Sequence, residues 1–104
     1  MAVEIYKIDF NTESDIYLKL YTMLPKQGCI ELQRDEAYKC HSWHQHVNDE
    51  TLLIIDGSLT FEYEDVSIIC KSGDVIHLPS MTKHQSTASS YGCIYAIAND
   101  IIEF

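Results

Sequence analysis

Three of the five histidines and a glutamate fall within ten residues of this chain, HSWHQHVNDE at positions 41–50. Side chains on a β-strand alternate between its two faces, so a strand here would point His44 and His46 the same way, about 6.5 Å apart along the chain. Glu50 follows four residues after His46. Imidazoles that project together with a carboxylate nearby are ligands that divalent transition metals bind. The stretch is therefore predicted to supply part of a metal site.

The framework that must hold this stretch is predicted to consist of short strands separated by turn residues. Strand-like segments cover residues 28–34, 37–46, 50–56, 59–65, 66–70, 75–79, 83–88 and 91–98. The run Asp56-Gly57-Ser58 predicts a hairpin between 50–56 and 59–65. Within 59–65, apolar and polar side chains alternate, which indicates one buried and one solvated face. About eight or nine strands at near-regular spacing predict an all-β sandwich or barrel.

Residues 11–24 fit two different elements. Ile16, Leu18 and Leu20 alternate as they would on a strand. A short helix fits equally well, with an apolar face of Ile16, Leu20, Met23 and Leu24 and a start at Asn11 or Thr12. The sequence leaves both interpretations open. It contains no repeat and no linker, so a single domain over residues 1–104 is predicted.

Composition excludes several partners. The net charge of −9 and the scattering of the seven basic residues argue against nucleic acid, because phosphate binding needs clustered Lys and Arg. The opening MAVEIYKIDF lacks the apolar run of a secretory signal, and LLII at 52–55 is too short to span a bilayer. A cytoplasmic protein with no membrane partner is expected. Its four cysteines, Cys29, Cys40, Cys70 and Cys93, are expected to be reduced and mostly buried.

A second motif lies downstream in GDVIHLPSMTKH, residues 73–84. Together the two stretches resemble the two motifs of the cupin family. The first motif runs His-x-His, three residues, Glu, six residues and Gly, which fits His44, His46, Glu50 and Gly57. The second runs Gly, five residues, Pro, four residues and His, which fits Gly73, Pro79 and His84. The resemblance covers about residues 28–98 and implies a cupin-type jelly-roll β-barrel (a double-stranded β-helix).

The resemblance also implies a ligand set of His44, His46, Glu50 and His84 for one divalent transition metal per chain. Three neutral imidazoles and one carboxylate leave such an ion with a net charge of about +1 and, if it is octahedral, with two open positions. Open positions distinguish a reactive site from a structural zinc site, which is closed and tetrahedral. Fe, Mn, Ni, Zn, Co and Cu all suit these ligands, and affinity alone does not choose among them.

The chain departs from the family pattern at three positions without losing a ligand. Tyr38 and Met81 stand where the family usually has glycine, and Ala88 stands where it usually has asparagine. A turn glycine often serves a positive φ that other residues adopt only at a cost. The turn at 79–84 is therefore expected to follow a different path and to place Met81 near the pocket mouth.

Two further residues, His77 and Cys40, are candidates for a role near the metal, and two others are expected to face away from it. His77 is predicted to be either an acid or base of the pocket or a core histidine with satisfied hydrogen bonds. Cys40 shares the strand parity of His44, so it is expected inside the barrel, as a packed or a redox-active thiol. His41 and Trp43 have the opposite parity and are expected to face away, with Trp43 packed between sheets or in a dimer contact.

The resemblance implies three kinds of function. The first is a metal-dependent enzyme acting on a small organic molecule, as a dioxygenase, isomerase, cyclase or lyase. The alternative is a non-catalytic cupin that binds or senses a metal or a metabolite. A storage or structural cupin is the third, although such proteins often lack ligands and this chain has all four. A homodimer is also expected, because exposed sheet edges favour pairing.

Overall fold

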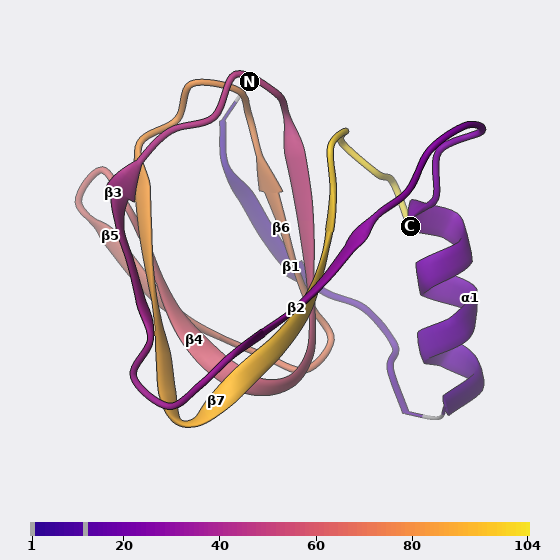
Figure 1. The fold of residues 1–104 in the computed structure, drawn as a ribbon, viewed down its shortest axis with the longest axis horizontal. Helices are drawn as coiled ribbons and strands as arrows, with labels where there is room; N and C mark the ends of the chain where they lie inside the picture. Colours follow the sequence, from indigo (N-terminus) through magenta and orange to yellow (C-terminus); the bar gives the residue numbers. More distant parts are fainter. Residues whose placement is uncertain (1, 12) are drawn as a thin grey trace.

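The computed structural model describes residues 2–11 and 13–104, and within them it contains seven strands and one helix. All strand pairs are antiparallel, in the order β1-β6-β4-β7-β2, with β3 added to β7 and β5 added to β4. The strands curve around a common centre (Figure 1), so the predicted all-β jelly-roll barrel is confirmed. The elements in chain order are β1 (Glu4–Lys7), α1 (Glu13–Met23), β2 (Glu31–Asp35), β3 (Cys40–His44), β4 (Glu50–Tyr63), β5 (Val66–Lys71), β6 (Asp74–Leu78) and β7 (His84–Ala98).

Two long strands, β4 and β7, pair along their lengths, from Thr51 opposite Ala98 to Tyr63 opposite His84. The hairpin predicted at 56–58 is therefore wrong, because β4 continues through it. Gly57 has φ +74° and lies at a register shift in β4. A single residue with positive φ forms a β-bulge, which bends a strand without reversing it. Strand β7 likewise continues through Gly92, so the predicted segments 83–88 and 91–98 form one strand.

The apolar side chains separate into two cores on the two faces of the sheet. The inner core lies within the barrel and includes Leu52, Ile54 and Phe61. The outer core includes Leu53 and Val75 and is covered by α1 and by the C-terminal segment. Both faces of β4 are thus buried, which explains its unbroken run LLII at 52–55.

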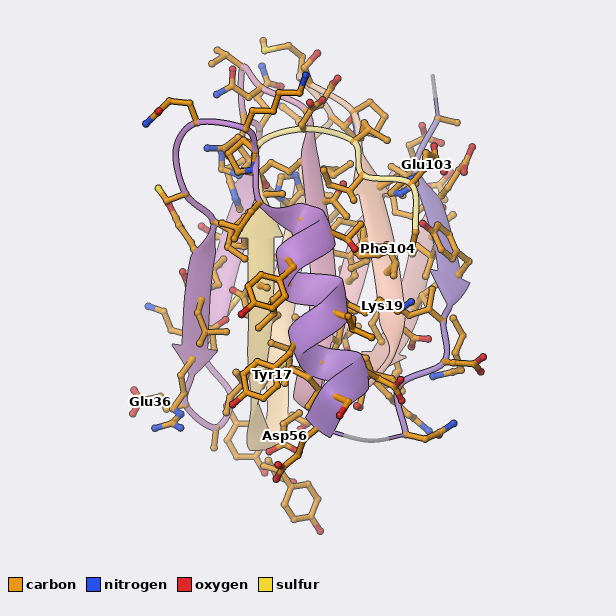
Figure 2. The ribbon with its side chains drawn as sticks, turned by 90° about the vertical axis from the view of Figure 1, so that its right-hand side faces the viewer. Tyr17, Lys19, Glu36, Asp56, Glu103 and Phe104 are labelled. Carbon is orange, nitrogen blue, oxygen red and sulfur yellow. The ribbon has the colours of Figure 1, made fainter. Side chains whose placement is uncertain are left out.

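The segment 11–24 contains helix α1, so its interpretation as a strand is wrong. The backbone N–H of Asn11 donates to the Asp15 carboxylate at 2.9 Å, a helix-start contact, whereas Thr12 lies outside the described residues. Met23 is buried, and Leu20 packs beside it in the outer core. Figure 2 shows the helix lying along the outside of the sheet. In the described part of the chain, no helix is long and apolar enough to cross a membrane.

Two of the positions where the family usually has glycine keep a left-handed backbone. Tyr38 has φ +63° and Met81 has φ +61°. The backbone N–H of Met81 donates to the carbonyl of His46 at 2.7 Å, which ties the turn to the predicted ligand loop. The turn therefore keeps the backbone conformation that glycine favours, and the side chain of Met81 does not line the cavity around the histidines. Met81 thus lies beside the predicted ligand loop without lining the cavity, and its place near the pocket mouth stays a prediction.

The strain at Met81 can be measured with two variants. Met81→Gly and Met81→Ala both remove a side chain that is 55% exposed, but only glycine adopts φ +61° freely. We expect the glycine variant to be more stable than the alanine variant by about 0.5–1 kcal/mol, after the larger unfolded-state entropy of glycine is subtracted. Urea unfolding of both proteins measures this difference. Equal free energies of unfolding would show that the turn relaxes in the alanine variant.

Candidate metal centre

Three of the four predicted ligands converge at one end of the barrel. The ring nitrogens of His44, His46 and His84 that could bind an ion lie within 4.8 Å of one another. The ring centroids of His44 and His84 are 4.3 Å apart, and those of His44 and His46 are 4.7 Å apart. The sequence places His84 forty residues from His44, and the pairing of β3 with β7 sets the two directly opposite each other.

A bulge in β3 changes which of its residues face the barrel. His41 is opposite Ser86 and His44 is opposite His84, so three steps along β3 match two steps along β7. The extra residue reverses the side-chain parity. His41 therefore lines the same cavity as His44, and the prediction that it faces away is wrong. Cys40 is exposed and does not line the cavity, so its predicted place inside the barrel is also wrong.

Hydrogen bonds orient two of the converging imidazoles. Nδ1 of His84 donates to the carbonyl of Thr82 at 2.8 Å, and Nδ1 of His44 donates to the carbonyl of Ser42. Because a carbonyl only accepts, each neutral ring carries its proton on Nδ1 and presents the lone pair of Nε2. Backbone carbonyls fix metal-binding histidines in this way in known sites. Both rings are thus arranged to coordinate a cation through Nε2.

The protonation state of His84 also suits a metal. His84 is buried, and burial lowers the pKa of its imidazole despite the hydrogen bond to Thr82. The ring is therefore neutral near pH 7, the form that binds metals. Phe61 stacks on it, with centroids 5.6 Å apart and an interplanar angle of 21°, and so restricts its rotation.

Glu50 is the fourth predicted ligand and lines the same cavity. Its Oε1 lies 3.9 Å from Nε2 of His46, too far for a hydrogen bond but compatible with two ligands of one ion. Burial raises the pKa of Glu50, and the nearby Glu31 carboxylate raises it further, while His46 and His44 lower it. A cation bound here would offset this unfavourable environment of the carboxylate.

The loop that carries these ligands is fastened to the second motif. Besides the bond from Met81 to His46, the backbone N–H of Ser80 donates to Oδ1 of Asp49 at 2.8 Å.

The three imidazoles and the carboxylate form a donor set that fits a divalent transition metal. Two nitrogens bound to one ion at about 2.0–2.1 Å each lie at most about 4.2 Å apart. The present separation of the three nitrogens, within 4.8 Å, is close to that limit.

The converging ligands open into a cavity of about 340 Å³ within the barrel. Leu52, Phe61 and Ile97 form apolar walls, and Gln33, His41 and Tyr95 add polar groups. Such a combination is typical of small-molecule sites, and this volume is at the lower end of their range.

Comparison with known proteins agrees with this arrangement. The family model described as the cupin domain matches residues 31–91, which is more than half of the chain. The chain belongs to the cupin family. No curated protein sequence matches this cupin.

Solved structures share the fold at low sequence identity. An RmlC-like cupin from Shewanella frigidimarina is 14% identical with a TM-score of 0.61, and the match covers 66% of this chain and 61% of that chain. A cupin superfamily protein from Desulfitobacterium hafniense is 15% identical (TM-score 0.63, 96% and 79% covered). A DUF861 family protein from Thermotoga maritima is 16% identical (TM-score 0.63, 94% and 99% covered). These similarities concern the fold.

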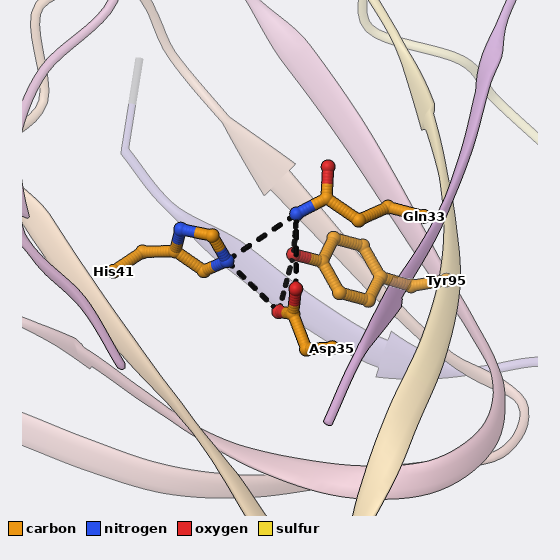
Figure 3. A network of polar contacts seen from close by, with 4 residues as sticks. All are labelled: Gln33, Asp35, His41 and Tyr95. Atoms are coloured by element: carbon orange, nitrogen blue, oxygen red, sulfur yellow. Dashed lines mark hydrogen bonds and ion pairs between the residues drawn. The ribbon is translucent and has the colours of Figure 1, made fainter. Parts of the chain in front are cut away.

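Beside the histidine cluster the cupin contains a polar network that sequence analysis missed (Figure 3). Asp35 is buried and accepts hydrogen bonds from the Tyr95 hydroxyl at 2.8 Å, from His41 at 3.0 Å and from the Gln33 amide at 3.0 Å. Burial alone would raise the pKa of Asp35, but these bonds outweigh it and hold the pKa below its ordinary value. Only the bulge and the strand register bring the four residues together.

The network makes stability depend on pH in a defined direction. Since the folded-state pKa of Asp35 is lowered, its stabilisation is present above the ordinary pKa of 3.8 and is lost as pH falls through the folded value. Asp35→Asn should cost about 1–3 kcal/mol at neutral pH. The difference from the unmodified protein should shrink below about pH 4. Urea unfolding across this range measures it, and a difference independent of pH would contradict the assignment.

His77, the predicted acid or base, lies outside the cavity. It is buried, and its Nε2 is 2.8 Å from the Ile102 carbonyl and 3.0 Å from the Tyr6 hydroxyl. The ring thus links β6 to β1 and to the C-terminal segment. Of the two interpretations left open by the sequence, the structure supports the core histidine and not the pocket residue.

Replacing His77 separates these interpretations experimentally. His77→Ala is expected to lower the free energy of unfolding by about 2–4 kcal/mol, because it removes a buried ring and leaves the Ile102 carbonyl without its donor. Metal content per folded chain should not change. Elemental analysis together with urea unfolding checks both quantities. Loss of metal from a folded variant would show that His77 contributes to the metal site after all.

Trp43 and Cys40, both within the described residues, do not line the cavity. Trp43 is 48% exposed, so its predicted packing between sheets is wrong. All four cysteines, which lie within the described residues, are free thiols, but only Cys70 and Cys93 are buried. Burial, helped by nearby carboxylates, raises the pKa of each of these two thiols to about 12, so they are protonated and unreactive at neutral pH.

Proposed function

We propose that this cupin is a metal-dependent enzyme that holds one divalent transition metal through His44, His46, His84 and Glu50. The observation that carries the proposal is the convergence of the three imidazoles, two of them with Nδ1 bonded to carbonyls and Nε2 free to coordinate. Side chains that served packing alone would not need their lone pairs directed to one point at the head of a cavity.

The cavity supports a small organic molecule as the substrate. Its apolar walls suit a short carbon skeleton, and its polar groups would orient hydroxyl or carbonyl oxygens. The lining residues, all in the described part of the chain, include no Lys or Arg, whereas Glu31 and Glu50 are both present. A strongly anionic substrate is therefore disfavoured. When bound, the metal would supply a Lewis acid or, if redox-active, an oxygen-activating centre.

Elemental analysis of tag-free protein, purified without chelators or added metal, tests the proposal. Close to one ion of Fe, Mn, Ni, Co, Cu or Zn per chain is expected. Iron or copper would direct assays to dioxygenase chemistry with oxygen consumption as the readout. Zinc, nickel, cobalt or manganese would direct them to isomerase, cyclase or lyase reactions. Protein that contains no metal and takes none up on titration would overturn the proposal and leave a non-catalytic binding cupin.

The homodimer predicted from the sequence is also a proposal. Strands β1, β2, β3 and β5 each have one partner within the described chain, so their outer edges are open to pairing. Sedimentation equilibrium distinguishes a 12.0 kDa monomer from a species of twice that mass. A monomer at all concentrations would contradict the proposed dimer.

A further inference from the structure

We propose that His41 is the general base of the cavity, with Nδ1 as the proton-accepting atom, and that Asp35 is its positioning residue. Catalysis by His41 rests on the proposed function, since it needs a substrate in the cavity. The assignment of protons to His41 and its neighbours does not depend on the proposed function, because it follows from the hydrogen bonds of the chain itself.

The hydrogen bonds of the network show which atom of each residue carries a proton. The Asp35 carboxylate, kept ionised by its partners, can only accept. Burial and the neighbouring Asp35 raise the pKa of Tyr95, so its hydroxyl stays protonated and donates to Oδ2. The Gln33 amide donates one hydrogen to Oδ1 of Asp35 and the other to the Tyr95 oxygen at 3.1 Å. The only remaining contact of the carboxylate within the network is with Nε2 of His41.

His41 must therefore carry a proton on Nε2. Its Nε2 lies 3.0 Å from Oδ2 of Asp35, and a lone pair on Nε2 would face the carboxylate unfavourably. Gln33 is 3.3 Å from the same nitrogen, but both of its amide hydrogens are already used, so this contact is not a hydrogen bond. In the neutral ring the lone pair then sits on Nδ1.

Nδ1 of His41, the proposed proton acceptor, is accessible from outside the protein core. In the described residues, every buried side-chain nitrogen and oxygen has a hydrogen-bond partner, and Nδ1 of His41 has none, so it is not buried. The side chain is 31% exposed and lines the cavity that the histidine cluster heads. Asp35, by contrast, is 5% exposed. An accessible imidazole backed by a buried carboxylate has the arrangement of a general base and its orienting group.

The arrangement depends on several residues and on a departure from regular strand geometry. Burying a carboxylate is unfavourable by several kcal/mol when its hydrogen bonds are incomplete, and three partners from three strands are needed to satisfy this one. The bulge in β3 turns His41 inward, where a regular strand would have faced it outward. Apolar residues at positions 35 and 41 would fill the same space without a buried charge.

The class of substrate follows from the base and from the absence of cations in the lining. We infer a neutral carbonyl compound with a hydrogen on the adjacent carbon. His41 Nδ1 takes that hydrogen as a proton, the electron pair of the broken C–H bond moves to form a C=C bond, and the carbonyl oxygen becomes an enolate. The resulting imidazolium is stabilised by Asp35. Where the carbon that lost its hydrogen also carries a hydroxyl, as in dihydroxyacetone, the hydroxyl proton passes to the enolate oxygen and the hydroxyl oxygen becomes the new carbonyl. Delivery of the abstracted proton to the former carbonyl carbon then completes an isomerisation without any oxidant or reductant.

The first test needs no substrate. Long-range proton–nitrogen NMR of protein labelled with ¹⁵N-histidine reports which ring nitrogen carries the proton. In metal-free protein at neutral pH, Nε2 of His41 is expected to be protonated. In Asp35→Asn the carboxylate that fixes this proton is gone, so the form protonated on Nδ1 should gain population. A neutral His41 protonated on Nδ1 in the unmodified protein, or an unchanged ring in the variant, overturns the proposal.

The second test measures proton transfer with dihydroxyacetone, a small neutral carbonyl compound, as the probe. The metal-loaded protein in D₂O should exchange carbon-bound hydrogens of the probe for deuterium, followed by proton NMR. His41→Gln should slow this exchange at least about 100-fold, and Asp35→Asn at least about tenfold. Cys40→Ser, an exposed neighbour on the same strand, is the matched control and should exchange at the unmodified rate.

The two proposals fail in distinguishable ways. Metal content is measured on the same samples, and His41→Gln should keep it, because His41 is not a ligand. Protein without metal contradicts the proposed function but leaves the NMR test of His41 intact. Exchange that is absent in metal-loaded protein, or that persists in His41→Gln, overturns the role of His41 as base.

Discussion

Replacing His84 by alanine is expected to abolish stable metal binding while the barrel stays folded. The imidazole of His84 is the only proposed ligand from the second motif, and its Nε2 is held toward those of the first. Altering residues that merely orient a metal ligand costs about 10–100-fold in affinity, so loss of a ligand should cost at least about 100-fold. Titration with the native metal, followed by calorimetry, measures the dissociation constant directly.

Stability provides an independent readout of the same change. A free metal concentration of 100 times the dissociation constant should raise the free energy of unfolding of the unmodified protein by about 2.7 kcal/mol. His84→Ala at the same metal concentration should gain almost nothing. His41→Gln, which alters another histidine of the cavity, is the matched control and should keep the full gain. Equal metal stabilisation of His84→Ala and the unmodified protein would refute the ligand assignment.

Gly57→Ala is the substitution expected to damage the fold most. A Cβ at position 57 would lie 2.2 Å from the carbonyl oxygen of Gly92, which is backbone and cannot rotate away, and φ is +74°. The strained φ and the overpacking each cost about 1–3 kcal/mol, so together they should remove about 2–6 kcal/mol. That is a large part of the stability of a small domain.

Gly28→Ala separates the two contributions. Gly28 also has a positive φ, +125°, but an added Cβ would meet only the side chain of Pro25 at 3.4 Å. It should therefore show the backbone strain without the clash, and the difference between the two variants in urea unfolding isolates the clash. If both variants lose the same free energy, β4 and β7 must be able to separate at Gly57, and the account of the bulge is wrong.

The glycine at 57 also shows where local sequence signals mislead. Asp-Gly-Ser carries the residues of a tight turn, yet the chain continues as one strand. A glycine with positive φ is compatible with both outcomes, since a turn and a bulge use the same backbone region. The choice depends on whether residues 59–63 find a better partner in β7 than in residues 50–56, and β7 is distant in the sequence.

His41 illustrates the same limit at the candidate site. Alternation predicts the face of a strand residue correctly only while the strand is regular. Neither Ser42 nor Trp43 marks the bulge that turns His41 inward. Its partners Asp35 and Tyr95 are separated by sixty residues, and nothing in their local sequence connects them. The polar network therefore cannot be predicted from the sequence, because it depends on which strands pair and in which register.

The family, the all-β class and the four proposed metal ligands can be predicted from the amino-acid sequence, because motif spacing and strand periodicity are visible along the chain. The burial of the run at 52–55 can be predicted in the same way. The continuity of β4 and β7, the inward face of His41 and the place of His77 outside the cavity become apparent from the three-dimensional arrangement of the strands. Bulges, register and long-range hydrogen bonds depend on which strands lie side by side, and that is settled by the packing of the whole barrel.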